Sequence, residues 1–112
     1  MTEKAGVRQR LVEYLVERAF QPVLQVDPER YPENQRAKLA NLQRATENEI
    51  DRFQTYDTPE KVVAMFHDDI TSGRAKEVHR QLHDLGLPTL DDVRGDFERL
   101  AERLGVTGRR GH

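Results

Sequence analysis

The chain has 112 residues, a length at which a single domain is expected. Charged side chains make up 34% of it, and 18 basic residues are intermixed with 20 acidic ones to give a net charge of −2. This balance disfavours nucleic acid as a partner, because a polyanion is attracted by clustered positive charge. There is no cysteine and no long continuous apolar run, so we expect a cytoplasmic protein with no membrane partner and no disulfide or thiolate chemistry.

Apolar residues recur at helical spacing along the chain, and no stretch alternates as a strand does. A first helix is expected to reach about residue 26. Pro22 should cause a kink or an early stop at 19–21, because a proline removes a backbone hydrogen bond and clashes with the preceding turn. A long second helix is expected over 32–56, followed by three shorter helices over 59–72, 74–85 and 90–104.

Glycine and proline set the ends of the shorter helices. Gly86 and Gly105 each follow the last apolar residue of a helix and precede another apolar residue, which is the pattern of a left-handed helix stop. Gly73 is expected to end the preceding helix in the same way. Thr89 follows Pro88 and can accept the first free N–H groups of the last helix.

The predicted fold class is therefore all-α: a compact bundle of four to five helices, with long first and second helices and three shorter ones. Residues 1–106 are expected to form this single domain, and residues 107–112, which show no periodicity, a flexible C-terminal tail. Four helices each carry one phenylalanine on the apolar face, and we expect these four side chains to meet in one core: Phe20, Phe53, Phe66 and Phe97.

Histidines form the best candidate for a chemical site. His79 and His83 are four residues apart and share one side of a helix, and His67 on the neighbouring helix can supply a third ligand for a metal ion. We favour the alternative that these are boundary histidines, whose rings cover the edge of the core while their polar tips stay in water. No glutamate directly follows His79, so the helical motif of zinc proteases is absent.

No catalytic signature is present in the sequence. It contains no glycine-rich phosphate loop and no nucleophile elbow, and its carboxylates fall on solvated faces or at helix starts. We therefore assign no catalytic residue, expect no cofactor, and do not predict an enzyme.

The second predicted helix carries five residues that fall in a narrow stripe along one face: Leu39, Leu42, Thr46, Glu49 and Phe53. Its three-and-four spacing suits a helix–helix seam, and Thr46 and Glu49 place a polar break in the middle of it. The helix is also longer than the three that follow, so part of it must project or find a partner. We expect this stripe to be the interface of a homodimer; the alternative is that the first helix covers it within one monomer.

The sequence thus predicts a small helical protein–protein interaction module, a self-associating regulatory or adaptor subunit. The alternative function is a bundle that binds a metal or a small ligand through His67, His79 and His83, around a pocket beside Phe66.

Overall fold

The all-α bundle that the sequence predicts is confirmed. The structure, a computed structural model, describes residues 2–106, without the side chains of residues 2–4 and 73–75. It is 82% helical, and no strand occurs in the described residues. No helix within them combines the length and the apolar character needed to span a bilayer. The predicted tail, 107–112, lies outside the described residues.

The N-terminal helix continues through Pro22 instead of stopping before it. Helix α1 (Thr2–Leu15) runs into a π-helical turn, η1 (Val16–Phe20), and from there into α2 (Gln21–Leu24). The N–H of Gln21 donates to the carbonyl oxygen of Val16, five residues back, which widens the turn. The irregularity expected from Pro22 is therefore present, but as a π turn upstream of it, because the wider turn takes up the strain that a proline imposes.

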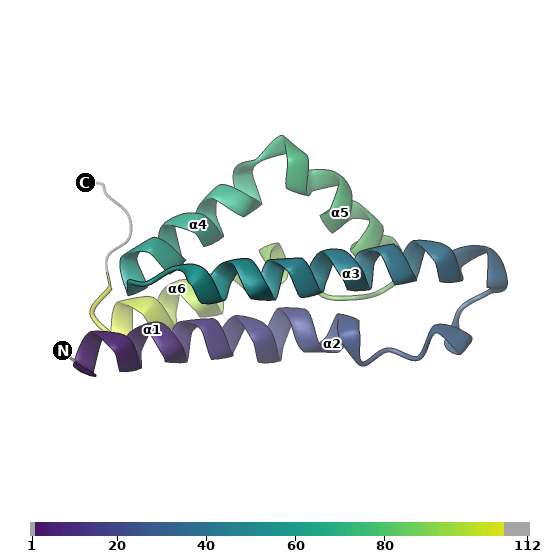
Figure 1. The fold of residues 1–112 in the computed structure, drawn as a ribbon. Helices are drawn as coiled ribbons and strands as arrows, with labels where there is room; N and C mark the ends of the chain where they lie inside the picture. Colours follow the sequence, from purple (N-terminus) through teal and green to yellow (C-terminus); the bar gives the residue numbers. More distant parts are fainter. Residues whose placement is uncertain (1, 107–112) are drawn as a thin grey trace.

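The remaining helices fold over this rod (Figure 1). A short 3₁₀ turn, η2 (Pro28–Arg30), leads into the long central helix α3 (Glu33–Thr55). Helices α4 (Pro59–Thr71) and α5 (Gly73–Asp84) form an inverted V above α3, and after a loop and a second 3₁₀ turn, η3 (Asp91–Val93), helix α6 (Arg94–Arg103) packs against α1.

The two predicted glycine stops near the C-terminus are confirmed. Gly86 and Gly105 have φ angles of 75° and 83°, the left-handed region that glycine tolerates best. After Gly86, the N–H of Leu87 reaches back to the carbonyl of Leu82 at 2.9 Å, and so closes the end of α5.

The predicted stop at Gly73 is wrong. Gly73 is the first residue of α5, and the break between α4 and α5 falls on Ser72, whose extended backbone has φ −72° and ψ 134°. One extended residue is enough to turn the chain, so no left-handed glycine is needed to set the angle of the V.

Buried apolar side chains form two clusters. The first, here called the phenylalanine cluster, lies among α1, η1, α4, α6 and the C-terminal part of α3, and it includes all four phenylalanines, as predicted: Phe20, Phe53, Phe66 and Phe97. The second, here called the leucine cluster, lies between α2, the N-terminal part of α3 and α5: Val23, Leu39, Leu42, Leu82, Leu85 and Leu87. The sequence did not predict this division.

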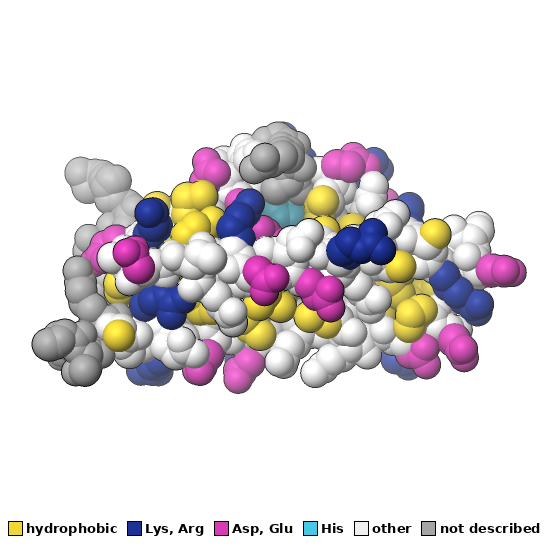
Figure 2. All heavy atoms as spheres, in the orientation of Figure 1, with side chains coloured by type: hydrophobic (Ala, Val, Ile, Leu, Met, Phe, Trp, Pro, Cys, Tyr) yellow, Lys and Arg dark blue, Asp and Glu magenta, His cyan; other side chains and the backbone are white. Residues whose placement is uncertain are grey.

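The stripe predicted as a dimer seam faces the interior of the chain. Leu39 and Leu42 belong to the leucine cluster and Phe53 to the phenylalanine cluster. Between them, Thr46 is buried and the side chain of Glu49 is 26% exposed. Helices of the same chain therefore cover the stripe, α5 among them, and not the first helix alone as in the alternative given above. The outward surface is mixed in charge, and Figure 2 shows basic and acidic side chains intermingled over one face.

Exchanging Leu42 for glutamate tests whether the stripe is internal. Leu42→Glu should destabilise the fold by at least about 3 kcal/mol, because it removes a packed side chain and puts a charge in the leucine cluster. Ala40→Glu, on the exposed side of the same helix, should stay within about 0.5 kcal/mol of the wild type. Chemical denaturation followed by circular dichroism measures both. A stably folded Leu42→Glu protein whose only change is from dimer to monomer would show that the stripe contacts a second copy.

Candidate functional site: a cavity between the two clusters

A cavity of about 410 Å³ lies between the two clusters. Its walls are the middle of α3, the end of α4, the inner side of α5, the π turn η1 and the loop after α5. Phe20 and Leu90 of the phenylalanine cluster form one side, and Leu82 of the leucine cluster forms the other. This volume is within the range of pockets that hold small molecules, about 300–1,000 Å³.

Buried polar residues converge on this cavity. In the part of the chain that the structure describes, three polar or charged residues are buried, and all three line the cavity: Thr46, Asp69 and Thr89. They come from three different segments, namely α3, α4 and the loop before η3. A buried polar group costs free energy unless it is paired, so packing alone does not explain why all three line the same space. Their convergence marks this cavity as a candidate site.

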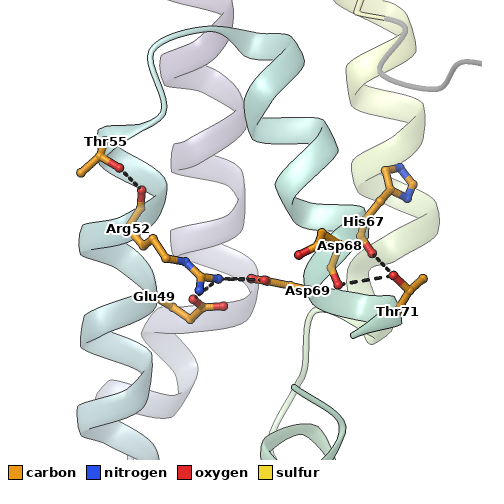
Figure 3. A network of polar contacts seen from close by, with 7 residues as sticks. All are labelled: Glu49, Arg52, Thr55, His67, Asp68, Asp69 and Thr71. Carbon is orange, nitrogen blue, oxygen red and sulfur yellow. Dashed lines mark hydrogen bonds and ion pairs between the residues drawn. The ribbon is translucent and has the colours of Figure 1, made fainter. Parts of the chain in front are cut away.

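An ion pair joins α3 to α4 at the cavity wall (Figure 3). Nη2 of Arg52 donates to both carboxylate oxygens of Asp69, at 2.8 and 2.6 Å, and lies 2.6 Å from Oε1 of Glu49. Burial opposes the charge on Arg52, but the carboxylates of Glu49 and Asp69 outweigh it and raise the pKa of the guanidinium, which stays a cation. Both bonds to Asp69 leave from one nitrogen, and the buried Nε of Arg52 has no partner within the described structure.

Of the three predicted metal ligands, His79 alone lines the cavity, together with Thr46 and Glu49 of the predicted interface stripe. Its imidazole is half-buried on α5, and burial lowers its pKa from 6.5 although the charges of Asp69, Asp91 and Asp92 oppose that shift. The ring is therefore neutral at pH 7. It makes no hydrogen bond or ion pair with the described residues, so its N–H donor and its second nitrogen, an acceptor, are both unused.

Two threonine hydroxyls complete the polar wall. Thr89 caps the start of η3, as predicted: its Oγ1 accepts from the N–H of Asp92 at 3.3 Å, and its own N–H donates to the Asp92 carboxylate at 3.0 Å. The hydroxyl hydrogen of Thr89 has no acceptor among the described residues. Thr46 donates to the carbonyl of Leu42 at 2.8 Å, which leaves its oxygen able to accept.

The other two predicted ligands lie elsewhere. The ring of His67 lies nearly perpendicular to that of Phe66 and faces Glu98, with 3.5 Å between Nε2 and the carboxylate, and His83 is exposed on α5. Phe66 is itself fully buried and does not line the cavity, so the pocket expected beside it is not the one observed. Within the described residues, no group of three His, Asp or Glu side chains is placed to hold a metal ion.

A second hollow, of about 850 Å³, lies between α1 and α6. It is larger, but eight of its ten lining residues are charged, four of each sign: Arg10, Arg18, Arg99, Arg103, Glu13, Glu17, Asp96 and Glu102. These side chains balance one another on a solvated face, so this groove offers a ligand little desolvated surface and no net charge.

Asp69 and Arg52 are the site residues that the sequence analysis missed. A signal was available for Asp69, because it follows Val62 and Phe66 at three-and-four spacing and so falls on the buried face of α4. A carboxylate at such a position predicts a buried partner, although it does not say which cation supplies it.

Neither protein-family models, nor curated proteins, nor solved structures gave a significant match to this chain. The function therefore has to be argued from the cavity itself.

Removing the charge of Asp69 should weaken the link between α3 and α4. We expect Asp69→Asn to lower the free energy of unfolding by about 1–2 kcal/mol; the loss is limited because Arg52 is 37% exposed and water replaces part of the interaction. Asp68→Asn, the exposed neighbour, is the matched control and should change stability by less than about 0.5 kcal/mol. Equal stability of the two variants in urea unfolding would mean that the ion pair does not hold the helices together.

Proposed function

We propose that this chain is a small helical binding protein that holds a partly apolar small molecule in the cavity between α3 and α5. The observation that carries the proposal is the convergence on one cavity of three buried polar residues and the unpartnered His79. An apolar pocket with a few polar groups directed into it is the usual form of a small-molecule site.

The lining residues match that form. Seven of the fifteen lining residues have apolar side chains, and they come from η1, α3, α5 and the following loop: Ala19, Phe20, Ala45, Val78, Leu82, Pro88 and Leu90. The polar groups then fix orientation, because each can make few hydrogen bonds and their positions are set by separate segments of the chain. The π turn at η1 supplies Ala19 and Phe20, and such turns recur at functional sites.

The site favours binding over catalysis. A nucleophile would need a base within hydrogen-bond reach, and His79, the neutral imidazole in the wall, is hydrogen-bonded to none of the described side chains. The proposal keeps the small-ligand function given as an alternative in the sequence analysis, but with a different residue set: His79 stays, and His67 and His83 are replaced by Thr46, Asp69 and Thr89.

Self-association as an adaptor subunit stays a prediction. The stripe expected to carry it is covered within one chain, so a second copy or another protein would have to use a different surface. No contact in the described structure favours such a surface over the cavity.

Filling the cavity tests the proposal. We would titrate three naphthalene probes, 2-naphthalenemethanol, 2-naphthylmethylamine and 2-naphthoate, and follow the amide chemical shifts of α3 and α5. Ala45→Phe places a ring in the cavity and should weaken the binding of any probe that binds by at least about tenfold, or 1.4 kcal/mol, with the fold retained.

Ala40→Phe is the matched control, since Ala40 is exposed on the same helix. It should bind as the wild type does. The proposed function would be contradicted if none of the probes bound the wild type saturably, or if both variants lost binding equally.

A further inference from the structure

From the chemistry of the cavity wall, we infer that the molecule it holds is uncharged, with an apolar body and a hydroxyl, amide or similar group that exchanges hydrogen bonds with His79 and Thr89. This inference rests on the proposed binding function and names the class of ligand. Three independent properties of the wall support it: its paired charges, its unused hydrogen-bonding groups and the placement of its apolar residues.

The three charged side chains that line the cavity, Glu49, Arg52 and Asp69, are paired with one another. Arg52 is held by Asp69 and Glu49 at 2.6 Å each, and Asp69 has both of its oxygens on the same guanidinium nitrogen. An anionic ligand would meet a guanidinium whose charge two carboxylates already balance, with only its buried Nε–H unused, and a cationic one would have to compete with Arg52 for Asp69. Either would separate a partly buried ion pair or carry an unpaired charge into an apolar space, and both outcomes are costly.

Apart from the buried Nε–H of Arg52, whose guanidinium charge is balanced by two carboxylates, the unused hydrogen-bonding groups of the buried wall are neutral. His79 offers one donor and one acceptor, and the hydroxyl hydrogen of Thr89 is a second donor. A hydroxyl or amide group on a ligand both donates and accepts, so it can satisfy His79 and Thr89 together. A purely apolar ligand would displace water from these groups without offering them a hydrogen bond, which lowers affinity.

The apolar residues place the body of the ligand. Val78 and Leu82 flank His79 on α5, one residue before it and three after it, and Phe20 and Leu90 belong to the opposite cluster. If the polar group of the ligand lies at His79, apolar residues therefore contact the rest of the ligand from both sides.

The protonation state of His79 gives this assignment a pH signature. Ionisable groups face His79 from three elements: Asp69 from α4, Asp91 and Asp92 from η3, and Glu49 and Arg52 from α3. Burial outweighs the three aspartates and lowers the pKa of the imidazole, so the acceptor nitrogen is free at neutral pH. Below that pKa, the proton takes the acceptor and adds a charge, so protons and a neutral ligand compete for the same site.

The three naphthalene probes separate the possibilities, because they share one apolar body and differ in charge at pH 7.5. We expect 2-naphthalenemethanol to bind the wild type at least tenfold more tightly than the amine or the carboxylate. Its affinity should fall as the pH is lowered through the pKa of His79, by up to about tenfold for each pH unit below that pKa.

Near-isosteric variants test the two residues. His79→Phe and Thr89→Val should each weaken binding of the alcohol several-fold, and His79→Phe should also remove the pH dependence. His83→Phe, on the exposed side of α5, is the control and should retain both the affinity and the pH dependence. The pH dependence is a readout that loss of packing alone would not abolish.

Two results would overturn the inference while leaving the proposed function intact. One is tighter binding of the amine or the carboxylate than of the alcohol to the wild type. The other is binding of the alcohol that is independent of pH and unchanged in His79→Phe. Binding of none of the three probes instead contradicts the proposed function itself, so the two failures are distinguishable.

Discussion

The polar interruption in the inward face of α3 is the constraint on which the rest of the structure depends. Leu39 and Leu42 at one end and Phe53 at the other are buried in two different clusters, and Thr46 and Glu49 stand between them. A continuous apolar stripe would favour one continuous core, because apolar side chains pack wherever neighbours can cover them. The polar pair instead faces a cavity, and the core divides around it.

The neighbouring elements fit that division. Helix α4 is tied to α3 at the cavity wall by the ion pair between Arg52 and Asp69, whereas α5 turns away at Ser72 and packs on the leucine cluster. Two anchored helices that diverge from one point leave space between them, and the polar residues that line this space lie outside both clusters. The two clusters hold most of the fold, and under the proposed function the polar residues between them would orient the ligand.

Much of this was predictable from local sequence. The left-handed stops at Gly86 and Gly105, the cap at Thr89 and the meeting of the four phenylalanines each depend on a residue type at a fixed spacing, and the structure confirms them. The polar break at Thr46 and Glu49 was also visible. The cavity that this break faces could not be predicted, because it depends on the angle between α4 and α5. That angle is set by the single extended residue Ser72 and not by a sequence motif. Likewise, the partner of Asp69 lies 17 residues away on another helix, and spacing alone does not identify such pairs.

Replacing the polar residue at the centre of the stripe tests the central claim most directly. If Thr46 faces a cavity, Thr46→Leu adds apolar atoms to free space and should raise the free energy of unfolding by about 0.5–2 kcal/mol in urea denaturation. If the middle of the stripe is already closely packed, the larger side chain has no room, and the same substitution should lower stability by about 1–3 kcal/mol. A stabilised variant supports a core divided by a cavity, and a destabilised one contradicts it.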